Sequence, residues 1–182
     1  MAAPAPAAGA RAERSTLVLL VRHAEKADPL AADPPLSATG TTRALALRDA
    51  LADAGVTAVI VTPRLRTRDT ARPLAEARGL IPEVVDLGAG GATHAQAVAA
   101  AVRRHAGGVV LVVGHSNTIP AIIAALGGPR LPDLCDANYT TLFAVSLDAP
   151  ADPSRGARVV RARYGAPDPP GAESCATQPA MR

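Results

Sequence analysis

The chain has 182 residues and a formal net charge of +3, a length that suits one domain with a sizeable hydrophobic core. Aromatic residues account for only 2% of the sequence and tryptophan is absent. This composition argues against aromatic platforms that stack the bases of single-stranded nucleic acid, so we expect no nucleic-acid partner. No apolar run reaches the roughly 18 residues of a membrane-spanning helix, so we expect no membrane span.

The composition changes at both ends of the chain. Residues 1–14 are rich in Ala and Pro, and they lack the positively charged start and apolar run of a signal peptide. Residues 167–182 are polar, with several Pro and one Gly. We therefore expect a disordered leader over residues 1–14, a single domain over residues 15–166 and a polar C-terminal tail over residues 167–182.

Between these ends, apolar runs alternate with amphipathic stretches. The expected elements, in chain order, are strand 17–21, helix 41–54, strand 56–61, a helix from Thr62 to about Gly79, strand 83–87, helix 93–105, strand 109–113, a helix from Asn117 to Gly127, and strands 140–147 and 158–164. The last strand is expected at a sheet edge. This alternation predicts an α/β fold, a three-layer α/β/α sandwich with a mostly parallel central sheet.

Helix boundaries follow from a few residues with known positional preferences. Gly55 suits the position just after a helix. Thr62 is a good cap and Pro63 suits the first helical position. Pro73 is expected to distort the helix in which it lies.

Two of the four histidines each follow an apolar strand. His23 comes after the strand over residues 17–21, and His115 follows the strand over residues 109–113. Ligands of open α/β sheets bind outside the carboxyl ends of the strands. We therefore expect both histidines at one rim, although a single histidine after a strand is usually a surface or turn residue.

The strand over residues 56–61 is also followed by polar residues, as are the two strands that precede the histidines. This segment carries Arg64, Arg66 and Arg68. Residues two apart on a helix diverge by about 200°, so the three cannot share one face. Either one of them faces the rim, or Arg64 and Arg68 do so together. The alternative is a solvated basic helix.

Taken together, these segments resemble the signature blocks of the histidine phosphatase superfamily, the phosphoglycerate-mutase-like group. The blocks occur in family order within residues 17–128. Later segments around residues 139–143 and 163–165 resemble small bacterial members. The matching residues are Arg22-His23-Ala24-Glu25, Leu36-Ser37-x-x-Gly40, Thr62-Pro63-x-x-Arg66-x-x-x-Thr70-Ala71 and Gly114-His115-Ser116.

The resemblance implies a role for four residues. His23 is the expected nucleophile, which takes the phosphoryl group as phosphohistidine. To attack, its imidazole has to be neutral, with the other ring nitrogen donating to a backbone carbonyl. Arg22 and Arg66 are expected to bind the phosphoryl oxygens, and His115 to donate to the same oxygens. No metal and no cofactor is expected.

The family also uses a carboxylic acid to protonate the leaving group. Asp86 is the preferred candidate because it lies nearest the expected strand end, with Glu25 and Glu83 as alternatives. For each of the three, an exposed carboxylate without a catalytic role is the competing interpretation. His94, like Arg64 and Arg68, lies either at the pocket mouth or in solvent.

The resemblance implies a phosphatase that hydrolyses a phosphomonoester, a phosphohistidine or a phosphoanhydride. Its partner is then a small phosphorylated substrate or a phosphoprotein. One alternative is a phosphoglycerate-type mutase, which the short stretch between Arg66 and His115 disfavours. The other is a non-catalytic module that binds phosphorylated ligands, which would have no need of a nucleophilic histidine.

Two cysteines, Cys135 and Cys175, leave the compartment open. If they form a disulfide and a signal peptide has been removed, the protein is periplasmic or secreted. If both are free thiols, a cytoplasmic protein is expected, as the chain is written.

Overall fold

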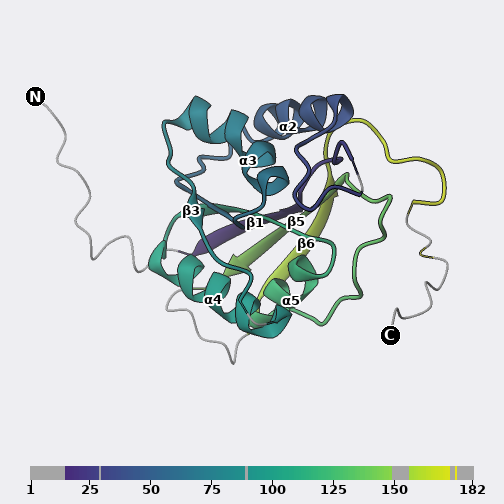
Figure 1. Ribbon diagram of the computed structural model, residues 1–182. Coiled ribbons are helices and arrows are strands. Elements are labelled where there is room, and N and C mark those ends of the chain that lie inside the picture. Colours follow the sequence, from purple (N-terminus) through teal and green to yellow (C-terminus); the bar gives the residue numbers. More distant parts are fainter. Residues whose placement is uncertain (1–14, 29, 89, 149–155, 173–174, 176–182) are drawn as a thin grey trace, which may run out of the picture.

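A computed structural model describes residues 15–28, 30–88, 90–148, 156–172 and 175. Its centre is a six-stranded sheet in the order β3-β2-β4-β1-β5-β6 (Figure 1). The first four of these strands are mutually parallel, and β5 runs antiparallel to both of its neighbours. The strands are β1 (Thr16–Arg22), β2 (Ala58–Val61), β3 (Glu83–Val84), β4 (Val109–Gly114), β5 (Thr141–Leu147) and β6 (Arg158–Arg163).

Helices cover both faces of the sheet. Helices α2 (Ala38–Ala50) and α3 (Leu65–Arg78) lie on one face, and α4 (Gly91–Arg104) and α5 (Thr118–Ala125) lie on the other (Figure 1). Strand β1 contributes to both halves of the core. Its side chains alternate between the two, with Val18 and Leu20 packed on the α4/α5 side and Leu19 and Val21 on the α2/α3 side. The predicted three-layer fold with a mostly parallel sheet is therefore confirmed.

The starts of α2 and α3 differ from the sequence prediction, because side chains accept hydrogen bonds from N–H groups in the first turn of each helix. Helix α2 begins at Ala38, since the Ser37 hydroxyl accepts from the Gly40 amide at 3.0 Å, and it ends at Ala50 rather than at residue 54. Thr62 does not cap α3. The Asp33 carboxylate accepts from the amide of Leu65 instead, at 3.2 and 3.3 Å.

Other elements are shorter or more regular than expected. Strand β3 has only two residues, and it pairs with β2 at the sheet edge. Helix α3 continues through Pro73 and ends at Gly79, whose φ of 63° is the left-handed conformation that glycine adopts without strain. Strand β6 forms the opposite edge of the sheet, as predicted.

The cysteines form a disulfide between Cys135 and Cys175. The structure therefore favours the paired alternative and ties part of the predicted tail to the domain. Asp168 also binds the domain, because its carboxylate accepts from the amide of Tyr139 at 2.9 Å. The predicted leader, residues 1–14, lies outside the described residues.

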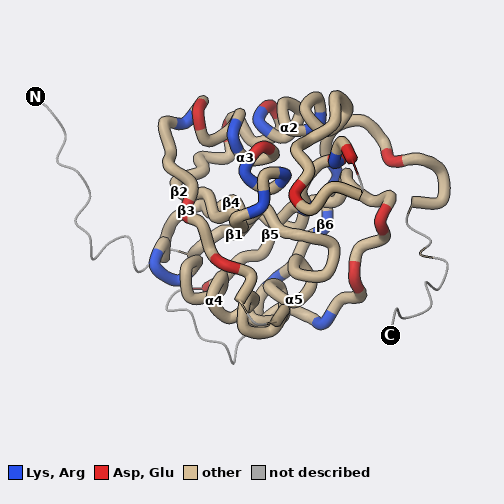
Figure 2. Tube along the Cα trace, in the orientation of Figure 1, with Lys and Arg blue, Asp and Glu red and all other residues tan. Residues whose placement is uncertain are grey.

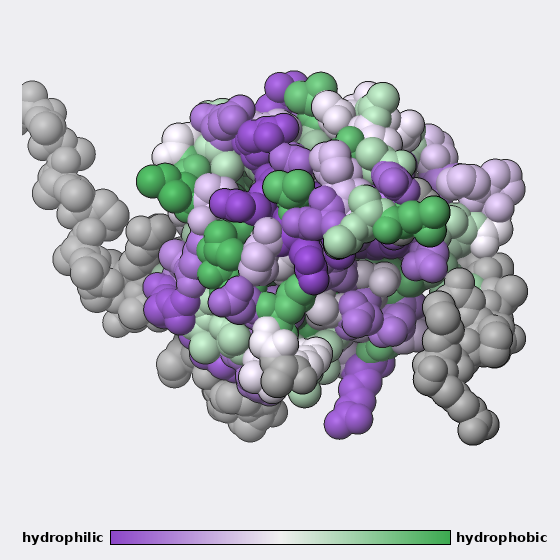
Figure 3. Space-filling view, viewed as in Figure 1, coloured by the Kyte–Doolittle hydropathy of each residue, from purple (hydrophilic) through white to green (hydrophobic). Residues whose placement is uncertain are grey.

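The surface offers no broad apolar region on the face shown in Figure 3, where apolar residues are scattered among hydrophilic ones. Within the described ranges, no helix is long and apolar enough to cross a membrane.

Gly40 allows α2 to pack against the segment that follows β1. A β-carbon at Gly40 would lie 2.2 Å from the carbonyl oxygen of Glu25. The Ser37 amide donates to that same carbonyl at 2.9 Å. The first turn of α2 therefore holds the backbone two residues beyond His23.

We expect Gly40→Ala to lower the free energy of unfolding by about 1–3 kcal/mol, because the forced shift of the Glu25 backbone outweighs the better helix propensity of alanine. Urea denaturation measures the change. Gly91→Ala is the matched control, since it also lies in a helix but a β-carbon there meets nothing within 4 Å. Equal stability of the two variants would contradict the packing argument.

Candidate active site

Parallel pairing of β1 with β4 brings the two strand-terminal histidines together. Arg22 lies opposite Gly114 in the register, and the amide of His23 donates to the Gly114 carbonyl at 2.9 Å. The next residue along each strand is a histidine, and the ring centroids of His23 and His115 are 5.4 Å apart. The predicted shared rim is therefore present.

One tautomer of His23 is selected by the backbone. Its Nδ1 lies 2.8 Å from the carbonyl oxygen of Ala24, which can only accept, so Nδ1 carries the proton and Nε2 the lone pair. The Ala24 peptide is held in turn by Thr70, whose hydroxyl accepts from the Ala24 amide at 2.9 Å and donates to the carbonyl of Arg66 at 2.7 Å. Burial lowers the pKa of His23 to about 3, so the imidazole is neutral at physiological pH.

Arg22 is a buried cation held mainly by carbonyl oxygens. Its Nη1 donates to the carbonyls of Cys135, Asp136 and Asn138 at 2.9, 2.9 and 3.3 Å. The guanidinium carbon lies 4.3 Å from the centre of the Tyr139 ring, a cation–π contact. Its Nε–H is buried and has no hydrogen-bond partner among the described residues. A buried donor without an acceptor is costly, so this atom is well suited to an incoming oxygen.

Arg66 reaches the site from the first turn of α3. Its Nη2 lies 3.4 Å from Nδ1 of His115, and its Nη1 lies 3.6 Å from the Asp33 carboxylate. Burial, together with the nearby guanidinium groups, lowers the pKa of Arg66. Arg64 and Arg68 are exposed. Arg66 is therefore the one of the three α3 arginines that meets the histidines.

His115 lies between Arg66 and a pair of threonine hydroxyls. Its Nε2 is 3.1 Å from the Thr62 hydroxyl, which is 2.9 Å from that of Thr67. Because Arg66 can only donate, Nδ1 accepts from it and Nε2–H donates to Thr62. Burial, and secondarily the charge of Arg66, lower the pKa of His115 to about 3.

A cavity of about 450 Å³ opens over these groups. Figure 2 shows Lys and Arg positions gathered around α3 and the end of β1, on the same side of the sheet. The glycine-rich segment before α4 and the first residues of α5 complete its wall. The lining residues are Arg22, His23, Lys26, Arg66, Leu87, Gly88, Gly90, Gly91, His94, His115, Ser116, Asn117, Thr118 and Asp136.

None of the three carboxylates expected from the sequence lines this cavity. Glu25 is held by Arg43, with contacts of 2.7 to 3.0 Å. Glu83 pairs with Arg104 and His105, which precede β4. Asp86 is exposed, and only its backbone carbonyl takes part in the site, as a hydrogen-bond acceptor.

The structure adds two residues that the sequence reasoning missed or misplaced. Asp136 lines the cavity, with a carboxylate oxygen 3.8 Å from Nη2 of Arg22. His94, expected at the pocket mouth or in solvent, is only 2% exposed and its Nδ1 donates to the carbonyl of Asp86 at 2.8 Å. No local pattern marks Asp136, since it lies in a segment without regular structure. The apolar side chains that surround His94 on α4 could have indicated its burial.

The described residues include no group of three or more His, Cys, Asp and Glu side chains that could hold a metal ion. That the reaction needs no metal stays a prediction.

Comparison with known proteins finds a family resemblance over part of the chain. Residues 18–87 match the model of the histidine phosphatase superfamily, branch 1. The resemblance of this part of the chain to the histidine phosphatase superfamily is therefore confirmed. The match supports a phosphatase, a hydrolase of phosphoryl groups, in general terms. No curated protein matches the chain.

Several solved structures share the fold over most of the chain. A putative phosphohistidine phosphatase SixA from Nakamurella multipartitia is 28% identical, with a TM-score of 0.60, covering 84% of this chain and 98% of its own. A mycobacterial glucosyl-3-phosphoglycerate phosphatase is 19% identical, with a TM-score of 0.63 and coverages of 85% and 100%. The protein histidine phosphatase SixA complexed with tungstate is 20% identical, with a TM-score of 0.63 and coverages of 81% and 96%. The last two support the superfamily fold alone.

The low pKa of His23 predicts a specific pH behaviour. Its folded-state pKa of about 3 lies below the ordinary value of 6.5. The unfolded chain therefore binds the proton first, and the contribution of His23 to the free energy of unfolding is present above pH 6.5 and lost as the pH falls toward 3. We expect nitrogen-detected NMR to show a neutral Nδ1–H tautomer from about pH 8 to about pH 5. In His23→Asn, the acid loss of stability measured in urea should be smaller, and titration of wild-type His23 near its ordinary pKa would contradict the assignment.

Proposed function

We propose that the protein hydrolyses phosphorylated substrates through a phosphohistidine intermediate on His23. The observation that carries this proposal is a neutral imidazole, with its lone pair on Nε2, in a cavity that Arg22 also lines. The Nε–H of Arg22 is buried and has no hydrogen-bond partner among the described residues. A nucleophile and an unsatisfied anion-binding donor in one buried place suit attack on a phosphoryl group.

In the first step, Nε2 of His23 attacks phosphorus. The new P–N bond replaces the bond to the leaving group, which departs with that electron pair and takes up a proton. In the second step, water attacks the phosphohistidine and returns a proton to the group that protonated the leaving group, and the P–N bond breaks to release inorganic phosphate and the neutral imidazole. Ala24 keeps the proton on Nδ1 throughout, so that Nε2 remains the reacting atom.

The two arginines bind the phosphoryl oxygens in this proposal. Arg22 offers Nε–H beside Nη2, and Arg66 offers the Nη2–H that contacts His115 in the free protein. Planar guanidinium groups match phosphoryl oxygens through paired hydrogen bonds. Their charges are only partly balanced by Asp33 and Asp136, which lie 3.6 and 3.8 Å away, so the cavity favours an anion.

His115 changes its hydrogen bonding when the phosphoryl group arrives. In the free protein its Nδ1 accepts from Arg66, so donation to a phosphoryl oxygen requires a second ring proton. Thr62 is already placed to accept from Nε2–H. The bound dianion favours the imidazolium, which then donates on one side to Thr62 and on the other to phosphate.

We propose Asp136 as the proton donor to the leaving group, in place of the expected Asp86. Asp136 carries the one carboxylate among the residues that line the cavity. It lies on the same loop that supplies carbonyl oxygens to Arg22. Glu25 and Glu83 are paired with arginines, and Asp86, which is exposed like Asp136, does not line the cavity.

The size of the cavity indicates the substrate class. A space of about 450 Å³ lies within the usual range of small-molecule pockets. It suits a small phosphate ester or a single phosphorylated side chain of a phosphoprotein. The names of two similar structures point to the same two classes. One is a putative phosphohistidine phosphatase, and the other is a glucosyl-3-phosphoglycerate phosphatase.

We expect His23→Ala to abolish turnover of p-nitrophenyl phosphate, by a factor of about 10³ or more, because the attacking atom is lost. Incubation with a labelled phosphodonor and rapid quenching should trap an acid-labile adduct on His23 of the wild type. His105→Asn is the matched control, since His105 pairs with Glu83 outside the cavity. Absence of adduct and turnover in wild type, with His23→Ala indistinguishable, would refute the enzyme function.

The choice of acid is tested with two leaving groups. We expect Asp136→Asn to slow hydrolysis of an alkyl phosphate by about 10²-fold, because an alkoxide needs a proton to leave. Hydrolysis of p-nitrophenyl phosphate should change little, since p-nitrophenolate leaves without one. Asp86→Asn should alter neither rate, and the reverse pattern would restore Asp86 as the acid.

A further inference from the structure

Arg22 depends on a loop that has no regular structure of its own. Residues 131–140 form neither helix nor strand. Three carbonyl oxygens of this loop, those of Cys135, Asp136 and Asn138, accept from Nη1 of Arg22. The orientation of the guanidinium group therefore depends on how firmly the loop is held.

The segment after β6 holds this loop in its middle and at its C-terminal end. We call residues 165–172 together with Cys175 the C-terminal strap. At one end of the loop, Asp168 accepts from the amide of Tyr139 at 2.9 Å, and from the amide and hydroxyl of Thr140 at 3.2 and 2.5 Å. In the middle of the loop, the disulfide joins Cys175 to Cys135, the residue whose own carbonyl contacts Arg22.

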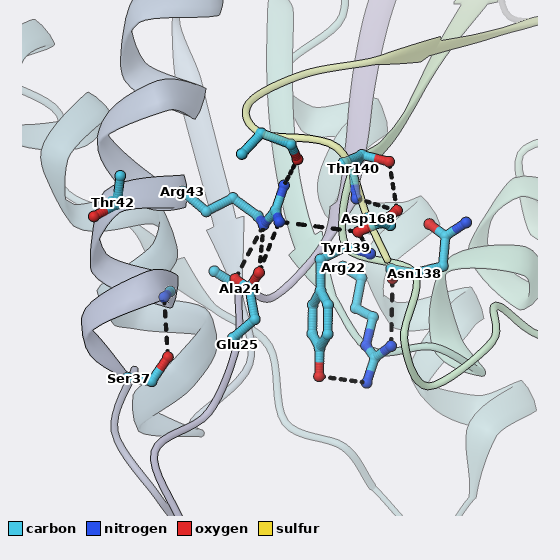
Figure 4. A network of polar contacts seen from close by, with 12 residues as sticks. Arg22, Ala24, Glu25, Ser37, Thr42, Arg43, Asn138, Tyr139, Thr140 and Asp168 are labelled. Atoms are coloured by element: carbon cyan, nitrogen blue, oxygen red, sulfur yellow. Dashed lines mark hydrogen bonds and ion pairs between the residues drawn. The ribbon is translucent and has the colours of Figure 1, made fainter. Parts of the chain in front are cut away.

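Arg43 connects the strap to the nucleophile side of the site. Figure 4 shows Arg43 between Glu25 and Asp168, with Arg22 and Tyr139 side by side just beyond. Its Nη1 donates to the carbonyl of Ala166 at 2.9 Å, and its Nη2 lies 3.9 Å from the Asp168 carboxylate. Asp168 thus has a buried ionic anchor, whereas the Cys175 end is held by the disulfide and is exposed to solvent.

We propose that the C-terminal strap positions Arg22 for phosphoryl binding, and that reduction of the Cys135–Cys175 disulfide by a dithiol weakens this binding. The proposal rests on the function proposed above. In the redox step the S–S bond breaks and each sulfur gains a hydrogen, while the two thiols of the dithiol are oxidised to its own disulfide. The loop then keeps its Asp168 tie but loses the tie at Cys135, and the carbonyl cradle of Arg22 loosens.

The test compares the oxidised protein with the protein fully reduced by dithiothreitol, with alkylation and mass spectrometry confirming both states. We expect the KM for p-nitrophenyl phosphate and the inhibition constant of inorganic phosphate to rise by about tenfold on reduction, a size typical of weakened hydrogen bonds to a charged group. The value of kcat should change less than about twofold, because Arg22 binds the phosphoryl group in the ground state and the transition state alike. A merely structural disulfide would instead reduce the folded fraction, which lowers apparent kcat and leaves KM unchanged.

Two variants complete the experiment. The double variant Cys135→Ser with Cys175→Ser should show the raised KM with or without dithiothreitol. Asp168→Asn, which keeps the disulfide but weakens the other tie, should raise KM in the oxidised state, and it carries the test if the reduced protein unfolds.

Unchanged KM and inhibition constant after complete reduction, together with a normal KM in Asp168→Asn, would overturn the proposal while leaving the phosphatase function intact. If the oxidised wild type shows no turnover, the proposed function fails. Calorimetric titration with inorganic phosphate then tests the strap separately, and equal affinity of the oxidised and reduced protein would overturn it.

Discussion

The parallel pairing of β1 with β4 at the centre of the sheet is the constraint on which the site depends. It places Arg22 opposite Gly114 and joins His23 to Gly114 by a backbone hydrogen bond, so the histidines after both strands share one edge. The same strands supply alternating side chains to the two halves of the core. The position of the two histidines is therefore as stable as the core itself. A shift in the β1–β4 register would displace the core side chains of these strands as well as the histidines.

Around the β1–β4 pairing, burial and nearby positive charge both lower the pKa values of His23 and His115. Two guanidinium groups lie beside two imidazoles, and burial with nearby cations keeps both imidazoles neutral, with pKa values of about 3. One partner of each ring then decides which nitrogen carries the proton, the Ala24 carbonyl for His23 and the Arg66 guanidinium for His115. The outcome is a neutral imidazole at His23 in a positively charged pocket, the combination that the proposed attack on an anionic phosphorus requires.

The part of the chain that matches the family model supplies only half of this arrangement. Residues 18–87 include Arg22, His23 and Arg66, whereas the carbonyl oxygens that hold Arg22 come from residues 135–138. Asp168 and Cys175 act on that loop from still later in the chain. The loop that holds Arg22 is thus tied to a C-terminal segment that composition alone describes as a polar tail.

The sequence by itself determined the order of strands and helices, the α/β class and the four residues that meet at the rim, because apolar periodicity and strand-end motifs are local signals. Tertiary structure alone decided that Asp136, and neither Asp86 nor Glu25, lines the cavity. It also decided that Asp33 caps α3 in place of Thr62. Those outcomes depend on contacts between residues that are distant in sequence. Arg22 and Cys135, for example, are 113 positions apart, and local patterns carry no information about such pairs.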